Sequence, residues 1–174
     1  MNEIAGENLM SDSEPIHKIR PTEPRWTHMA LHVNDIEASI VWYEKYTHLR
    51  VLARNEDTEG KGVWLGDGTE AQTPFILVLA QFFEGHDPFA PAVHAVLAPF
   101  AHIGIEVPTK EMVEEYAANA DKDGHLALGP LQMPDPVGYI CFIRDPDGNL
   151  VEFSYDQGVY EKAVEVWGND NERK

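Results

Sequence analysis

The sequence has one cysteine, few basic residues and no long apolar run. A single cysteine rules out a disulfide within the chain, and Cys141, in the apolar run YICFI, is expected to be a small core residue. No stretch approaches the roughly 20 apolar residues that a membrane-spanning helix needs. The N-terminal segment also lacks the basic and apolar regions of a signal peptide. We therefore expect a cytoplasmic protein with no membrane partner.

Basic residues are scarce beside acidic ones. The 174 residues include 13 Lys and Arg against 30 Asp and Glu, which gives a formal net charge of −17. Such a charge repels phosphate backbones, so it argues against a nucleic-acid partner. An apolar content of 43% is enough for one domain with a real core. We attribute most of this acidity to solubility, and only secondarily would it favour cationic ligands.

One sequence pattern occurs twice in the chain. WTHMALHVND spans residues 26–35 and FAHIGIEVPT spans residues 100–109. Side chains alternate between the faces of a strand, so His28 and His32 share one face, while His102 and Glu106 share one face of the second copy. The residues between them are apolar and suit a packed face. Two such strands indicate a duplicated unit that presents imidazole groups to a common site.

The remaining pattern predicts the same order of elements in both halves. In the first half a strand at 26–33 leads into a helix capped by Asn34 or Asp35, followed by strands at 48–54, 62–65 and 75–82. The second half repeats this with a strand at 101–107, a helix from Thr109, and strands at 125–132, 138–144 and 149–155. The sequence therefore predicts an α+β fold of two βαβββ modules with curved, mostly antiparallel sheets.

These elements divide the chain into three parts. Residues 1–25 are expected to form a flexible extension. The domain covers 26–157, with a first module at 26–83, a linker at 84–99 and a second module at 100–157. The linker is long for a simple connection and is expected to act as a lid or a substrate-contacting loop. A C-terminal helix and tail complete the chain at 158–174.

Three segments resemble a known family. They are HMALHVNDIEASIVWYE at 28–44, HIGIEV at 102–107 and DPDGNLVEF at 145–153. With their spacing they resemble the vicinal oxygen chelate superfamily, which includes glyoxalases, extradiol dioxygenases, fosfomycin-resistance transferases, methylmalonyl-CoA epimerase and bleomycin-resistance proteins. In that family two βαβββ modules curl around a divalent metal ion, bound by residues of the first and last strand of each module.

The resemblance implies that His28, His102 and Glu152 bind one divalent ion, which would be Fe, Mn, Ni or Zn. A fourth ligand is expected near residue 78, because Glu152 follows His102 by 50 residues. We align that position with Leu77, which cannot coordinate a metal, and Gln81 lies roughly 13 Å further along the strand. Two imidazoles and one carboxylate would leave coordination positions open for substrate oxygens.

Further residues are candidates for contact with substrate or for proton transfer. His32 takes the position of an arginine in glutathione-dependent glyoxalases, and Leu77, Gln81 and Tyr139 are the other candidates for substrate contact. Glu152 and Glu106 are the candidate catalytic carboxylates. The predicted function is that of a metal-dependent, glyoxalase-like enzyme. It would stabilise a carbonyl or enolate of a substrate chelated through adjacent oxygens, in an isomerase, lyase or thiol-transferase reaction.

Two other functions fit parts of this pattern. One is a non-haem Fe(II) extradiol-type dioxygenase. Extradiol enzymes are similar to this chain around residue 142 but have a tyrosine there, so Phe142 argues against this function. The other is a non-catalytic, bleomycin-resistance-like protein that binds a small molecule. Members of the family commonly pair, so we expect a homodimer. The sequence leaves open whether one chain or both build each metal site.

Overall fold

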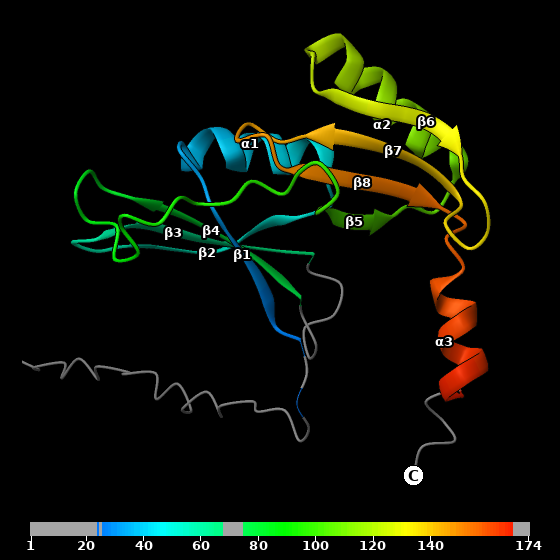
Figure 1. The fold of residues 1–174 in the computed structure, drawn as a ribbon, viewed down its shortest axis with the longest axis horizontal. Helices are drawn as coiled ribbons and strands as arrows, with labels where there is room; N and C mark the ends of the chain where they lie inside the picture. The colour runs from blue at the N-terminus through cyan, green and yellow to red at the C-terminus, as the bar shows by residue number, and fades with distance from the viewer. Residues whose placement is uncertain (1–23, 25, 68–74, 169–174) are drawn as a thin grey trace, which may run out of the picture.

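The protein consists of two similar modules followed by a C-terminal helix (Figure 1). The computed structural model describes residues 24, 26–67 and 75–168. The predicted extension at 1–25, apart from Pro24, therefore lies outside the described residues, as do the last six residues of the predicted tail. The order of the elements confirms the predicted α+β fold of two βαβββ modules.

The first module contains β1 (His28–His32), α1 (Ile36–Tyr46), β2 (Arg50–Glu56), β3 (Gly60–Gly66) and β4 (Ile76–Phe82). The second contains β5 (Ile103–Glu106), α2 (Lys110–Asp123), β6 (Leu126–Gln132), β7 (Tyr139–Arg144) and β8 (Leu150–Tyr155), and α3 (Val159–Trp167) follows it. Strand β3 begins two residues earlier than predicted. Asp57 accepts hydrogen bonds from the backbone N–H groups of Glu59 and Gly60, and this tight turn starts the pairing at Gly60.

Each module forms its own four-stranded sheet. The strand orders are β1-β4-β3-β2 and β5-β8-β7-β6, so the two sheets have the same connectivity. The first strand of each module pairs in parallel with the last, and the other pairs are antiparallel. Gly104 lies opposite Glu152 in one sheet as Ala30 lies opposite Val78 in the other. Positions on the paired first and last strands of one module therefore have counterparts in the other.

One face of each sheet is covered by the helix of its own module. Asp35 caps helix α1, and its side chain accepts hydrogen bonds from two backbone N–H groups of the first turn. Thr109 caps α2, and its hydroxyl accepts from the backbone N–H of Met112. Gly124 follows the last residue of α2 as its C-cap, where a φ of 77° favours glycine. The buried residues of the helices pack on Leu31, Val63, Leu65, Leu79, Cys141, Ile143, Val151 and Phe153.

The opposite faces of the sheets carry large exposed apolar side chains. Trp64 of β3 is 50% exposed and Leu128 of β6 is 53% exposed. Trp26 and Phe100, which precede the first strand of each module, are 86% and 87% exposed. Neither helix of the modules covers these side chains. Helix α3 buries none of its residues and extends away from both sheets (Figure 1).

A buried carboxylate joins the two modules. Asp145, in the turn between β7 and β8, is only 3% exposed and accepts a hydrogen bond of 2.9 Å from the hydroxyl of Tyr43 on α1. It also accepts hydrogen bonds from the backbone N–H groups of Asp147 and Asn149 and from the side-chain amide of Asn149. Burial, together with the neighbouring carboxylate, raises the pKa of Tyr43 well above its usual range, so its hydroxyl stays protonated and donates.

Polar contacts at both ends of α1 also join it to the second module. Lys45 and Tyr46, near the end of α1, both donate to the carboxylate of Asp123, the last residue of α2. At the other end, Asn34 donates to Asp147 through its backbone and its side chain. Helix α1 therefore packs on its own sheet and on the second module at once. No helix among the described residues has both the length and the apolar character that a membrane crossing requires.

We predict that loss of the Asp145 network destabilises the whole chain. Tyr43→Phe removes one hydrogen bond to a buried carboxylate and should lower the free energy of unfolding by about 1.5–3 kcal/mol. Asp145→Ala leaves four donors without their acceptor and should cost more, about 3 kcal/mol or above. Urea unfolding followed by circular dichroism measures both. Tyr160→Phe, on an exposed residue of α3, is the control, and equal stability of all four proteins would contradict the prediction.

Candidate metal centre

His102 and Glu152 meet on the uncovered face of the second sheet. His102 directly precedes β5, and Glu152 lies in β8, whose neighbours Val151 and Phe153 are fully buried in the core on the other face. The His102 Nε2 and Glu152 Oε2 atoms are 3.6 Å apart. The carboxylate side chain is 5% exposed and the imidazole 28% exposed. The edge of Phe142 packs against the imidazole, with ring centroids 5.2 Å apart.

The hydrogen bonds of His102 determine which of its nitrogens is available. Its Nδ1 lies 2.7 Å from the backbone carbonyl oxygen of Phe100, which is only an acceptor, so we infer that Nδ1 carries the proton. In the neutral imidazole Nε2 then has a free lone pair, and it faces a carboxylate oxygen. Two acceptors this close repel each other, and a cation between them, either a proton or a metal ion, removes that repulsion. Because ligand bonds of zinc-type ions are about 2.0–2.2 Å, both atoms can bind one ion.

The other oxygen of Glu152 has a partner that the sequence did not suggest. Gln157 donates from its side-chain amide to Glu152 Oε1 at 2.9 Å, and its backbone N–H donates to Glu106 Oε1 at 3.0 Å. Glu106 therefore faces the same site, as predicted from its strand position. Gln157 lies in the loop after β8, outside the repeated segments, and no pattern in the sequence marks it.

The structure does not bring His28 to this pair. His28 begins β1 in the first sheet, where it is exposed and its Nδ1 lies 2.9 Å from the Thr27 hydroxyl. Within the described residues no three His, Cys, Asp or Glu side chains are grouped closely enough to hold a metal ion. One chain by itself thus assembles two of the three predicted ligands.

The strand register corrects the position of the missing fourth ligand. Glu152 lies opposite Gly104, two residues after His102, and the residue opposite Ala30, two residues after His28, is Val78 rather than Leu77. Trp64 lies opposite Val78 as Phe142 lies opposite Glu152. The alignment with Leu77 was wrong by one residue, which in a strand means the wrong face. Val78 has no donor atom for a metal, so the expected gap in the ligand set persists.

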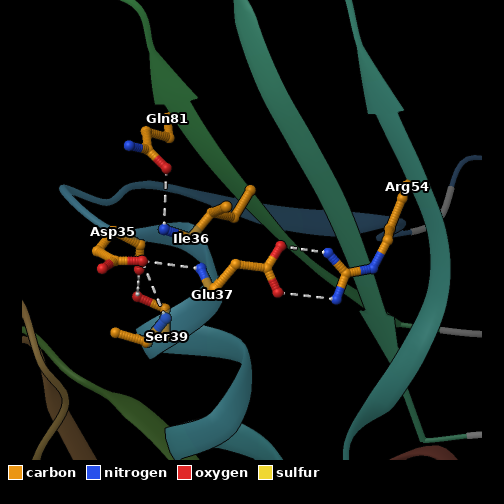
Figure 2. Close-up of polar contacts among 7 residues, drawn as sticks. Asp35, Ile36, Glu37, Ser39, Arg54 and Gln81 are labelled. Atoms are coloured by element: carbon orange, nitrogen blue, oxygen red, sulfur yellow. Dashed lines mark hydrogen bonds and ion pairs between the residues drawn. The ribbon is translucent and has the colours of Figure 1, made fainter.

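Three of the predicted substrate-binding residues lie on the helix side of their sheets. Leu77 is 4% exposed in the core. Gln81 accepts a hydrogen bond from the backbone N–H of Ile36 at the start of α1 (Figure 2). Tyr139 donates to Glu114 on α2. Because these side chains pack against α1 and α2, the structure does not support direct contact between them and a molecule bound at His28 or His102.

His32 lies on the same face as His28, beneath the linker. Its ring stacks on that of His94, with centroids 4.0 Å apart and planes 9° apart, and Phe82 stacks at 5.8 Å. His94 is paired with Asp87, with 2.8 Å between Nε2 and Oδ2. Burial lowers the pKa of His32 and the neighbouring His94 lowers it further, while Asp87 and Asp147 oppose this. The linker at 84–99 thus lies over the His32 end of the first sheet, and its action as a lid stays a prediction.

A cavity of about 300 Å³ lies elsewhere, between α1 and strands β2 and β3. Arg54 and Glu37 form an ion pair at its wall (Figure 2). It is on the helix side of the first sheet, away from His28 and His32.

Cys141 is not a candidate for chemistry at this centre. Burial raises the pKa of its thiol to about 12 and leaves it an inert core residue.

Comparison with known proteins places these features in a family. The model of the glyoxalase/bleomycin resistance protein/dioxygenase superfamily matches residues 25–153. The uncharacterized protein PA2024 of Pseudomonas aeruginosa is 35% identical over 134 residues, which cover 77% of this chain and 90% of that protein.

Solved structures show the same fold. The trypanothione-dependent glyoxalase I of Leishmania major is 26% identical, with a TM-score of 0.58, over 82% of this chain and 94% of that one. A FosX fosfomycin resistance protein from Listeria monocytogenes, in complex with Mn(II), is 16% identical with a TM-score of 0.57, over 80% and 97% of the two chains. The antibiotic-binding protein TnmS3 from Streptomyces sp. CB03234 has a TM-score of 0.53 at 19% identity, over 78% and 98%. With its duplicated βαβββ modules and a family match over most of its length, the chain belongs to the glyoxalase/bleomycin resistance protein/dioxygenase superfamily.

Proposed function

We propose that the protein is a metal-dependent, glyoxalase-like enzyme whose ion is bound by His28, His102 and Glu152. The observation that carries this proposal is the pair of facing acceptors, His102 Nε2 and Glu152 Oε2, 3.6 Å apart. A buried carboxylate beside a lone pair is costly unless a cation lies between them. Imidazole and carboxylate together suit Fe, Mn, Ni and Zn ions. Membership of the family and the likeness to a Mn(II) complex of FosX support the same reading.

A bound ion would polarise a substrate carbonyl or stabilise an enolate. The side chains around the ion would orient the ligands and transfer protons. The Phe100 carbonyl holds the His102 ring with Nε2 directed toward the site, which orients it in advance as a ligand. Glu152 keeps Oε2 free because Oε1 is bonded to Gln157, so Oε2 is the atom that exchanges a proton with substrate when it is not bound to the ion. Phe142 has no hydroxyl and packs on His102, which disfavours extradiol ring cleavage.

We further propose a homodimer in which each site takes His28 from one chain and His102 and Glu152 from the other. The first sheet of each chain presents His28 on an uncovered face, and the second presents the other pair on its own uncovered face. Exposed apolar groups surround both faces, including Trp26, Trp64 and Phe100. Pairing two copies would bury this surface and add the third ligand.

Covering the His32 end of the first sheet, the linker would control access of substrate. His94 occupies the face of the His32 ring on which a planar substrate group would stack. Substrate contact by His32 then requires the linker to move. The substrate itself is a small molecule that chelates through adjacent oxygens, and isomerase, lyase and thiol-transferase chemistry all use such a centre.

Metal content tests the ligand set. Protein purified without chelator should hold about one divalent ion per chain by elemental analysis, because three donors of this type bind such ions firmly. His28→Ala, His102→Ala and Glu152→Ala should each lose most of it. His48→Ala, on an exposed histidine with no role in the site, is the control. Absence of metal in the unaltered protein, even after reconstitution, would replace this proposal by that of a non-catalytic small-molecule binding protein.

Mixed dimers test the sharing of ligands between chains. His28→Ala and Glu152→Ala chains should each bind no metal alone, yet a refolded mixture should contain heterodimers with one intact site and one doubly altered site. We expect metal to return to a stoichiometry of about one ion per heterodimer, measured after separating the species by affinity tags. If each chain builds its own site, both sites of the heterodimer stay defective and no metal returns. A monomeric mass in solution would also refute the shared site.

Acid should loosen the stack under the linker. In the folded protein the pKa of His32 lies below its ordinary value of 6.5, so the unfolded chain takes up a proton first as the pH falls. The stability due to neutral His32 is therefore present above about pH 6.5 and is lost as the pH falls through the lower, folded-state pKa. His32→Phe keeps a stacked ring without titration, so its loss of unfolding free energy between pH 7.5 and 5.5 should be smaller. Identical losses, measured by urea unfolding, would contradict this, and His48→Asn is the control.

A further inference from the structure

Gln157 occupies an unusual position directly after β8. The residue before it, Asp156, has a φ of 61° and is the only non-glycine residue with positive φ among those that the structure describes. A non-glycine residue in this region is uncommon and costs conformational energy. The turn reverses the chain, so that the Gln157 side chain extends back over Glu152 instead of continuing toward α3.

The contacts of Gln157 link the two carboxylates of the site. Its side-chain amide donates to Glu152 Oε1 at 2.9 Å, while its backbone N–H donates to Glu106 Oε1 at 3.0 Å. An ionised carboxylate only accepts hydrogen bonds, so the group facing Glu152 must be the NH₂ of the amide. One oxygen of Glu152 is therefore occupied, and the other is the one that faces His102 Nε2 at 3.6 Å.

We propose that Gln157 is a positioning residue that holds Glu152 as a metal ligand through Oε2 alone. This inference rests on the proposed function. A free carboxylate can rotate about its last bond and can bind an ion with either oxygen or with both. The Gln157 amide fixes the rotation and engages Oε1, which leaves a single oxygen for the ion and keeps a further coordination position open for substrate.

Glu106 holds Gln157 in the position from which it donates to Glu152. Its bond to the Gln157 backbone holds the strained turn in place, and Glu106 itself is fixed at the end of β5, opposite Ser154. The structure thereby gives Glu106 a supporting role besides the general-base role expected from sequence. Groups that orient metal ligands typically contribute about 10- to 100-fold to metal affinity.

The test compares metal binding in variants of the full-length protein. Gln157→Met preserves side-chain length and removes the donor, and Gln132→Met makes the same change at an exposed glutamine of β6. Co(II) and Ni(II) are titrated by calorimetry, and the visible absorption of bound Co(II) reports the coordination. We expect Gln157→Met to bind both ions about 10- to 100-fold more weakly and to change the Co(II) spectrum. Gln132→Met should match the unaltered protein in both.

A second pair of variants separates positioning from folding. Glu106→Gln keeps an oxygen that accepts from the Gln157 backbone and should retain metal affinity and spectrum, whereas Glu106→Ala should shift both in the direction of Gln157→Met. Metal-free thermal unfolding of all variants shows whether each one folds. Unaltered protein that binds Co(II), beside a folded Gln157→Met variant with the same affinity and spectrum, overturns this inference and leaves the proposed function standing. Unaltered protein that binds neither ion overturns both.

Discussion

The buried carboxylate of Asp145 determines how the two modules face each other. Taking a carboxylate out of water is unfavourable unless its oxygens are fully hydrogen-bonded, and here four donors satisfy it. One of those donors, Tyr43, belongs to the other module. The turn between β7 and β8 can therefore keep its low-energy form only when α1 lies against it. Since α1 also packs on its own sheet, the position of the first sheet follows from that of the turn.

This arrangement has a direct effect on the candidate metal centre. The polar contacts between the modules run from α1 and the residue before its cap to the β7–β8 turn and to Asp123 at the end of α2. The side chains of His28, His102 and Glu152 take no part in these contacts. Each of the sheet faces that carry them is left with exposed aromatic groups and an incomplete set of metal ligands. The same contact that holds one chain together therefore leaves it open to pairing with a second copy. The linker, with its stack of His94 on His32, covers only one end of the first sheet.

Much of this fold was predictable because the two modules are defined by short-range sequence signals. Helix caps at Asp35 and Thr109, alternating apolar residues and the DPDG turn each act over a few residues, and all were visible in the sequence. The family resemblance also grouped His102 with Glu152, and the two side chains lie 3.6 Å apart. The assignment to Leu77 failed because a shift of one residue exchanges the faces of a strand, and only the pairing of β1 with β4 identifies Val78. Tyr139 was placed on the correct strand, but which face α2 covers is a tertiary property. Gln157 acts through a turn at Asp156 whose conformation no residue type in that segment requires.

Val78 in place of a fourth ligand makes the two flanks of the proposed centre chemically different. In a site completed by both modules, one flank carries the Glu152 carboxylate with its hydrogen-bonded amide, and the other carries the isopropyl group of Val78 beside the indole of Trp64. Water is held poorly against such a hydrocarbon surface, whereas the carboxylate flank holds charge and protons. A chelated substrate would therefore be handled asymmetrically. Proton transfer would take place from the Glu152 side, and apolar substituents would lie toward Val78, so the two prochiral faces of a planar enolate would not be equivalent.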